Sequence, residues 1–331
     1  MTLPADAYRL EGISPRALQH PADRAATAAL QQVPYLDAVI RKLIELGYER
    51  AYRQFYLGSS VRLGEKQLPH IWALEREAFN VLDIPEVPAL YLTQYPMANA
   101  MVIGAAQPIM VLNSETVRLL DEDGLRAVLA HEAGHVLSDH VLYATALQIL
   151  LLLGGRLPLL AGLPVMAIVA ALLEWFRAAE LTCDRASAAV TRDPLAVCRV
   201  LMTLSAGEAA SQLNLDAFMA QGLEYTEGGR GFERLSRLWL DLRLTHPMPV
   251  RRAHELLAWV RGGEYDRIVD GDYMRRGEEP APREEAEEAG QHYADRVKDA
   301  LQSAGESISD VGKQLGDWLD RTRSRPPDDD G

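Results

Sequence analysis

Apolar residues recur at steps of three and four positions along most of the chain, which is the spacing of one helical face. Residues 22–82 show this pattern in an Ala-rich opening, in a segment at 34–46 and in another at about 67–82. Between residues 87 and 112 the pattern changes to short β-rich runs, ALYLT, AMVIG and PIMVL, separated by Pro, Asn and Gly. We therefore expect a helical lead-in followed by a small sheet.

Helical spacing returns after the sheet. The acidic stretch Asp121–Asp123 is expected to cap a helix with the sequence LRAVLAHEAGHVLSDHV, because carboxylates stabilise the positive end of a helix. Further segments each carry an apolar stripe: WFRAAELTCDRASAAV, DPLAVCRVLMTL, LDAFMAQGLEY, FERLSRLWLDLRL and VRRAHELLAWV. The pattern predicts a predominantly helical α+β fold.

Residues 141–173 contain one charge, Arg156, between two apolar runs that are broken by glycine and proline. Neither run reaches the roughly 20 residues of a straight membrane span. Three interpretations remain: a shallow membrane hairpin, an apolar platform that faces a membrane, or the core of the domain.

The chain beyond Gly277 differs in composition. From Glu278 onward it holds 15 acidic and 7 basic residues, and this segment carries −8 of the net charge of −13. We expect an acidic disordered linker followed by an amphipathic helix at 291–322, which would bind a partner helix or mediate self-association. The predicted units are therefore a helical lead-in at 1–86 packed on the unit that follows it, a domain at 87–276 that includes the apolar stretch 141–173, and a tail at 277–331.

Charge and cysteine content exclude several classes of protein. The body of the chain has no basic cluster, so we expect no nucleic-acid partner. Cys183 and Cys198 form no disulfide framework and read as reduced thiols. The polar N-terminus lacks the apolar core of a secretory signal, which indicates the cytoplasmic side of the membrane.

The segment His131-Glu132-Ala133-Gly134-His135 matches the HExxH pattern of zinc proteases. Positions i and i+4 of a helix share a face, so the two imidazoles can bind one ion while Glu132 projects toward a water on that metal. Such a site needs a third protein ligand.

Two kinds of third ligand can be compared with the sequence. The metzincin pattern requires Gly at position 138 and His at position 141, where this chain has Ser138 and Val141. His140 is nine residues after His131 and would point to the opposite side of a straight helix, so we interpret it as a surface or second-role histidine. The other pattern places a glutamate on a later helix, and Glu180-x-x-x-Asp184 matches it.

At this point the chain resembles the gluzincin zinc peptidases, and within them the family of the CAAX prenyl endopeptidases and the bacterial HtpX-type membrane proteases. The resemblance spans about residues 91–252. It rests on Asn99-Ala100 before an edge-strand segment, HEAGH, Glu180-x-x-x-Asp184, and His246-Pro247 followed by Arg252. It implies a zincin-like metallopeptidase fold with a small sheet beside the HExxH helix.

The resemblance also implies roles for individual residues. His131, His135 and Glu180 would hold one Zn²⁺ per chain, and Asp184 would orient a liganding imidazole through a hydrogen bond. His246 would stabilise the oxyanion of the tetrahedral intermediate, and Arg252 would fix the loop that carries it. The segment at Asn99, Ala100 and Met101 would bind an extended polypeptide substrate as an added strand. Cys183 lies on the Glu180 helix, and we place it off the metal face as a small buried thiol.

These assignments predict a zinc endopeptidase in which Glu132 takes a proton from a metal-activated water and returns it to the leaving amine. The HtpX-type resemblance favours membrane association through 141–173 and a role in membrane-proximal protein quality control. No GxxxxGK loop for ATP occurs in the 331 residues. The competing hypothesis is a non-catalytic zinc scaffold that recruits a partner through its C-terminal helix, and the intact Glu132 argues against it.

Overall fold

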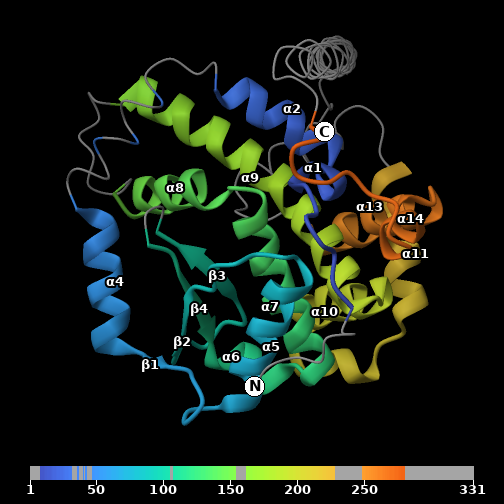
Figure 1. Ribbon diagram of the computed structural model, residues 1–331, viewed down its shortest axis with the longest axis horizontal. Coiled ribbons are helices and arrows are strands. Elements are labelled where there is room, and N and C mark those ends of the chain that lie inside the picture. Colours follow the sequence, from blue (N-terminus) through green and yellow to red (C-terminus); the bar gives the residue numbers. More distant parts are fainter. Residues whose placement is uncertain are drawn as a thin grey trace, which may run out of the picture.

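The computed structural model describes residues 8–31, 47–104, 107–153, 162–227 and 248–279, with Leu36, Ile40 and Lys42 as single positions between the first two ranges. Within these ranges the fold is mostly helical with one small sheet (Figure 1). The helices are α1 (Pro15–Leu18), α2 (Pro21–Leu30), α4 (Tyr48–Ser59), α5 (Pro69–Val81), α6 (Ser114–Leu119), α7 (Glu122–Leu137), α8 (Val141–Leu153), α9 (Gly162–Thr191), α10 (Pro194–Ala206), the 3₁₀ helix η1 (Gly207–Gln212), α11 (Leu215–Glu227), α13 (Pro249–Arg261) and α14 (Glu264–Val269). The predicted helices at 232–244 and 291–322 lie outside the described residues, and of the predicted helix at 34–46 only the three single positions are described.

The sheet has four strands in the order β1-β2-β4-β3. They are β1 (Val61–Arg62), β2 (Ala89–Thr93), β3 (Ala100–Ile103) and β4 (Ile109–Asn113). The pair β2 and β4 is parallel, whereas β3 runs antiparallel to β4 and forms one edge of the sheet. This confirms the predicted small sheet and its edge strand, and it adds β1, which the sequence pattern did not indicate.

Side-chain alternation along the strands separates two packing faces. One face contributes Leu90, Val102, Met110 and Leu112 to the main core around α7. The opposite face contributes Tyr91, Ile103, Ile109 and Val111 to a smaller cluster with Tyr52 and Tyr56 of α4. The sheet is therefore a middle layer between α4 and α7, and the edge strand β3 lies directly beside the HEAGH helix.

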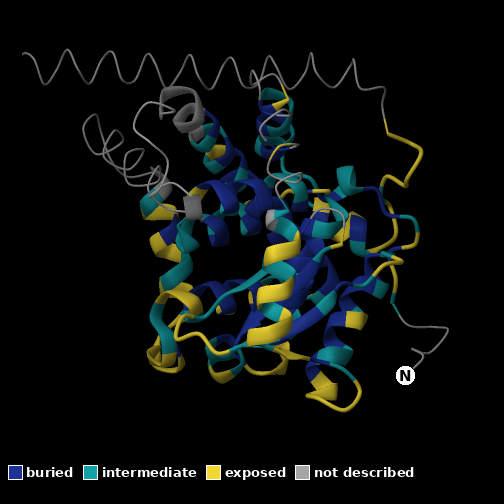
Figure 2. Ribbon diagram, turned by 90° about the vertical axis from the view of Figure 1, so that its left-hand side faces the viewer, coloured by how far each residue is buried: buried dark blue, intermediate teal, exposed yellow. Residues whose placement is uncertain are grey.

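Helix α4 was missed by the sequence analysis. Figure 2 shows it in front of the sheet with mostly exposed and half-buried positions. Its segment YERAYRQFYLGS has too few strongly apolar residues to predict a buried stripe.

The central helix α7 begins at the predicted cap, where the Asp121 carboxylate accepts a hydrogen bond from the Gly124 N–H at 2.9 Å. Helix α7 packs most extensively on α9, and α5, α10 and β3 cover its other sides. The two helices approach closely at Gly134, where an added Cβ would lie 2.9 Å from the Cβ of Ala186 and 3.2 Å from the Cα of Cys183. The glycine of HEAGH is therefore required by this helix contact.

The N-terminal segment packs into the main core rather than on its surface. Leu10, Ile13 and Leu18 are almost completely buried there. The Ser14 N–H donates to the Met274 carbonyl, and the Arg276 N–H donates to the Gly12 carbonyl, so the segment is also fixed by the end of the described chain.

A second core lies between α2, α8 and α9 and contains part of the apolar stretch 141–173. Ala144, Leu147 and Leu150 of α8 pack there with Leu172 and Trp175 of α9. Among the described residues, no helix combines the length and the apolar character that crossing a membrane requires. For these residues the structure agrees with the core interpretation.

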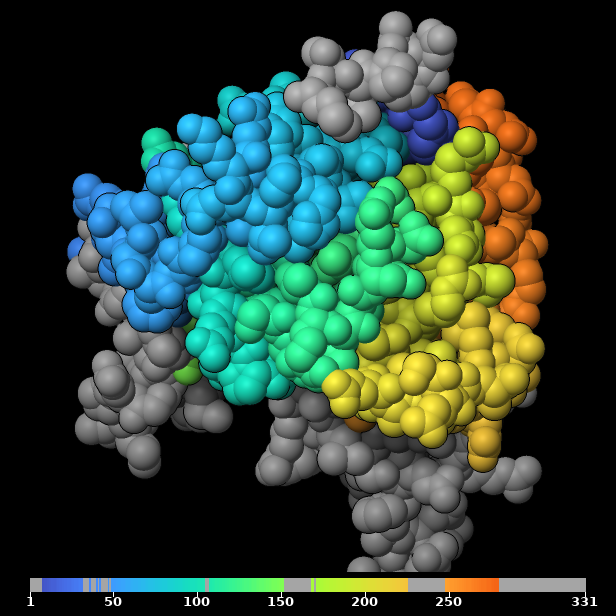
Figure 3. Space-filling view, turned by 90° about the horizontal axis from the view of Figure 1, so that it is seen from below, coloured from blue at the N-terminus to red at the C-terminus, as the bar shows by residue number. Residues whose placement is uncertain are grey.

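Figure 3 shows the face on which α6 lies next to α10, η1 and α11. Arg118 of α6 forms an ion pair with Glu208 of η1 across this face. Thr116 of α6 and several residues of α10 also line the pocket of the site described next.

Candidate metal centre and active site

Two helices bring the predicted ligands together. His131 and His135 lie one turn apart on α7 with their ring centroids 5.2 Å apart. Glu180 on α9 faces both of them, with Oε2 3.5 Å from His131 Nε2 and Oε1 3.2 Å from His135 Nε2. The two imidazole Nε2 atoms therefore converge on one carboxylate, and this donor set of two imidazoles and one carboxylate suits Zn²⁺.

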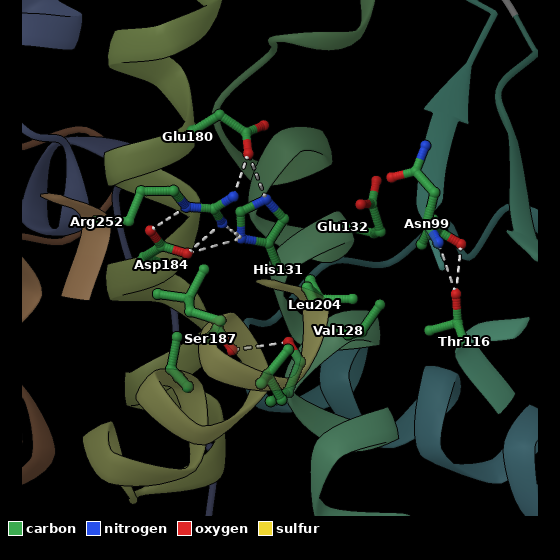
Figure 4. Close-up of a pocket in the computed structure, with 15 residues that line it drawn as sticks. Asn99, Thr116, Val128, His131, Glu132, Glu180, Asp184, Ser187, Leu204 and Arg252 are labelled. Carbon is green, nitrogen blue, oxygen red and sulfur yellow. Dashed lines mark hydrogen bonds and ion pairs between the residues drawn. The ribbon is translucent and has the colours of Figure 1, made fainter. Parts of the chain in front are cut away.

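Asp184, one turn after Glu180, lies on the other side of His131. Its Oδ1 is 3.2 Å from His131 Nδ1 (Figure 4). A carboxylate at this position accepts the Nδ1–H proton and leaves Nε2 free to bind a metal. The contact that the resemblance implied is thus present.

Arg252 enters the site from α13 and pairs with both acids of α9. Its Nη1 is 2.9 Å from Glu180 Oε2, while its Nε and Nη2 donate to the two oxygens of Asp184 at 2.8 and 2.6 Å. All three side chains are buried. Two buried carboxylates with a single guanidinium retain a negative charge, which favours a cation between Glu180 and the imidazoles.

The surroundings shift the pKa values of the two histidines in opposite directions. Burial disfavours a charge on His131, but the nearby carboxylates of Glu180 and Asp184 outweigh it and raise the pKa of His131 to about 9. Burial dominates at His135 and lowers its pKa to about 4. Neutral imidazole is the form that binds metal, so His135 is already in that form at neutral pH.

Glu132 is buried beside the imidazoles and projects toward β3. Burial raises the pKa of Glu132 to about 7, and the proximity of Glu180 adds to this, while His131, Arg252 and the Val102 N–H oppose it. A carboxylate with such a pKa can accept and return a proton near neutral pH. A bound divalent cation would lower this value.

A pocket open to solvent lies between the start of β3 and the helices α7, α9 and α10. His131, Glu132, Glu180 and Arg252 form its polar end, as Figure 4 shows for these labelled side chains. The rest is largely apolar, with Ala127, Val128, Val197, Val200, Leu201 and Leu204. A second, smaller pocket continues along β3 past Glu132 and His135 toward Phe176 of α9.

The predicted substrate-binding residues lie at this edge of the sheet. Ala100 and Met101 are in β3, and Asn99 and Ala100 border both pockets. The backbone of Asn99 is already used: its N–H donates to Thr116 Oγ1, and its carbonyl accepts from the Asn113 N–H. In this antiparallel register the backbone of Met101 also faces β4, so the backbone groups on the free edge of β3 are those of Ala100 and Val102.

The structure corrects the placement of Cys183. Its Sγ and one ring nitrogen each of His131 and His135 all lie within 4.8 Å of one another. We expected Cys183 to lie off the metal face, but it lies on that face. It is a free, buried thiol, as predicted. Burial and the surrounding carboxylates raise its pKa well above the usual value, which disfavours the thiolate that a metal ligand requires. We therefore keep Glu180 as the third candidate ligand.

The structure also corrects His140, which is buried rather than on the surface. Helix α7 ends at Leu137, and Asp139 adopts a left-handed conformation with φ of 60°. The His140 N–H then donates to the His135 carbonyl and the Asp139 N–H to the Val136 carbonyl, which is a Schellman motif. The assumption of a straight helix was wrong, and the turn brings the His140 ring back to His135.

His246 lies outside the described residues, so its predicted role stays a prediction. Asp23, Thr182 and Phe176 were missed. Phe176 stacks on His135 with ring centroids 5.7 Å apart, and Asp23 contacts His140. The sequence shows Asp23 only as an acid near the start of an Ala-rich helix, and nothing in the pattern connected it with the HEAGH helix.

The comparisons with known proteins agree with this geometry. The model of Peptidase family M48 matches residues 70–260. The chain is 36% identical over 256 residues to the plastoglobule-localized metallopeptidase 48, chloroplastic, of Arabidopsis thaliana, and the match covers 76% of this chain and 74% of that protein. No solved structure matches the chain. The protein is thus a metalloprotease, and the chain belongs to peptidase family M48.

Proposed function

We propose that the protein is a zinc-dependent endopeptidase in which His131, His135 and Glu180 hold the metal and Glu132 is the general base. One observation carries the proposal: two imidazole Nε2 atoms converge on the Glu180 carboxylate within 3.5 Å beside a buried glutamate. A non-catalytic zinc scaffold has no need of Glu132 in this position.

The residues present fit zinc. When bound, Zn²⁺ would polarise the peptide carbonyl and acidify a coordinated water. Asp184 holds the His131 ring through Nδ1, and Arg252 holds Asp184 and Glu180 in place. These contacts fix the orientation of the candidate ligands before any metal binds.

Glu132 carries the proton transfers in this proposal. It removes one proton from the attacking water as the carbon–oxygen bond forms, and it gives that proton to the nitrogen as the peptide bond breaks. The products are a new carboxyl and a new amino terminus, so no cysteine or serine nucleophile is required.

The substrate would lie extended along β3 between the two pockets. The Val102 N–H interacts with Glu132, and the Gly104 N–H donates to Thr145 of α8, so this edge of β3 faces the helices that carry the site. An extended peptide that pairs with the backbone of Ala100 on the free edge of β3, with Met101 lining the second pocket, would bring its carbonyl toward Glu132. The lining by Val197, Leu201 and Leu204 favours an apolar substrate side chain.

We further propose that the enzyme works near a lipid surface in protein quality control. Two observations support this: the related Arabidopsis protein is named as plastoglobule-localized, and residues 141–173 are apolar. Flotation of the purified protein with liposomes tests it, and recovery of the whole protein in the lipid-free fraction would argue against lipid association.

The test of the catalytic proposal combines zinc analysis with casein cleavage. Wild type should contain one zinc per chain, Glu132→Gln should keep the zinc and lose cleavage, and Glu180→Ala should lose both. Glu174→Gln is the matched control, because Glu174 lies on the same helix but is half exposed and pairs with Arg177. Cleavage by Glu132→Gln at the wild-type rate would overturn the role of Glu132, and full zinc content in Glu180→Ala would overturn the ligand set.

A further inference from the structure

A hydrogen-bonded chain of buried polar groups leads away from the candidate metal centre at His135, whereas Asp184 contacts the other histidine, His131. His135 Nδ1 lies 3.3 Å from His140 Nδ1, and His140 Nε2 lies 3.1 Å from Asp23 Oδ2. His140 is 2% exposed and Asp23 is 0% exposed. His135 therefore also has a carboxylate behind it, but the imidazole of His140 lies between them, whereas Asp184 contacts His131 directly.

Each member of this chain is held by further contacts. The Schellman turn at Asp139 fixes the backbone of His140, and the Trp175 ring meets the His140 ring edge-on at 5.4 Å. Asp23 accepts hydrogen bonds from Thr182 Oγ1 at 2.7 Å and from Thr27 Oγ1 at 3.2 Å. The hydroxyl of Thr27 also accepts from the Trp175 indole N–H at 2.9 Å. Such an arrangement leaves little rotational freedom for the His140 ring.

The protons in the chain have one consistent assignment if His135 binds metal through Nε2. His135 must then carry its proton on Nδ1 and donate it to His140 Nδ1. His140 accepts on Nδ1, so its own proton is on Nε2 and is donated to Asp23. Cys183 Sγ, 3.7 Å from His140 Nδ1, is only a weak additional donor to the same nitrogen.

We propose that Asp23 and His140 are positioning residues for the metal ligand His135, and that they fix its tautomer and ring orientation through this hydrogen-bonded chain. The inference rests on the proposed function, because it requires His135 to be a ligand. It extends that function by assigning part of the metal centre to α2, which precedes the segment 70–260 matched by the family model.

The hydrogen-bonded chain from His135 to Asp23 predicts how the affinity for Zn²⁺ responds to substitution of its members. Loss of a hydrogen-bonding partner behind a metal-binding histidine typically weakens metal affinity about 10- to 100-fold. We expect Asp23→Asn and His140→Phe each to weaken Zn²⁺ binding by a factor in this range. Because Asp23 acts through His140, the double variant should be no weaker than His140→Phe alone.

The experiment measures the affinity of the full-length protein for Zn²⁺ by competition with a chelating dye at fixed pH. Co²⁺ is then substituted, and its visible absorption is recorded at full occupancy. A changed hydrogen bond on His135 should shift the cobalt bands, whereas a loss of fold stability alone would leave them unchanged. Asp83→Asn is the control. The Asp83 carboxylate accepts a hydrogen bond from the Gly12 N–H, so this substitution weakens the attachment of the same N-terminal segment but changes no member of the hydrogen-bonded chain.

Wild-type affinity and unchanged cobalt bands in Asp23→Asn would overturn the inference, as would an equal loss of affinity in Asp83→Asn. Strictly additive losses in the double variant would also contradict it. If His140→Phe fails to fold, the near-isosteric Asp23→Asn decides alone. Failure of the proposed function has a different signature, since wild type would then bind no zinc or Glu180→Ala would retain it.

Discussion

At the residue scale, the site depends on charges that are buried together and compensate one another. Arg252 neutralises part of the charge of Glu180 and Asp184, and each oxygen of Asp184 accepts from its guanidinium. Glu75 on α5 is different. It is completely buried, and neither carboxylate oxygen has a hydrogen-bond partner among the described residues.

Glu75 gives a prediction about stability and pH. Burial raises its pKa to about 8, so the folded protein keeps this carboxyl protonated at pH values where the unfolded chain has released the proton. The folded state then binds more protons than the unfolded state, and the free energy of unfolding must fall as pH rises from about 4.5 to about 8. Replacing Glu75 by Met removes this penalty. We expect the variant to gain on the order of a few kcal/mol relative to wild type at pH 8 and much less at pH 5.

Urea denaturation of both proteins at pH 5 and pH 8 measures this difference. A gap between the two proteins that is the same at both pH values would show that Glu75 does not titrate in this range.

At the element scale, the position of α7 against α9 decides whether the histidines reach Glu180. The helices touch at Gly134, where no side chain fits between them. The ligands come from both helices, so a small displacement here changes the distances between His131, His135 and Glu180.

Gly134→Ala should therefore destabilise the protein by about 1–3 kcal/mol, because an added methyl group in a filled contact forces the helices apart. It should also weaken Zn²⁺ binding. Gly58→Ala is the matched control, since Gly58 lies in α4 with open space around it and alanine there should stabilise the helix by about 0.5–1 kcal/mol. Thermal unfolding of both variants with and without Zn²⁺ measures these effects. A Gly134→Ala protein that is more stable than wild type would contradict the close helix contact.

At the scale of the whole molecule, the metalloprotease needs more than the segment 70–260 matched by the family model. Leu10, Ile13 and Leu18 fill the main core, and Asp23 reaches the site through His140. Removal of one large buried aliphatic side chain typically costs about 2–5 kcal/mol, and a whole domain is stable by only about 5–15 kcal/mol.

A chain that begins at Pro69 should consequently lack cooperative unfolding and should aggregate. Size-exclusion chromatography and thermal unfolding check this. The comparison is a chain that ends at Glu279, which we expect to remain folded and to keep its zinc because it retains every described residue of the core clusters and of the candidate metal centre. A soluble, cooperatively unfolding chain from Pro69 onward would show that the N-terminal segment is dispensable.

The sequence by itself determined the features that depend on short-range geometry. A four-residue step places His131 and His135 on one face of α7 and Glu180 and Asp184 on one face of α9, and the Asp121 cap is read from neighbouring residues. Short β-rich runs separated by Pro, Asn and Gly likewise predicted β2, β3 and β4. Only the tertiary structure decided which helix faces meet. Asp23 and His140 are 117 positions apart, Cys183 lies on the metal side, and Arg252 bridges both acids of α9. These contacts follow from the packing of helices and from one left-handed residue at Asp139, and neither leaves a periodic signal in the sequence.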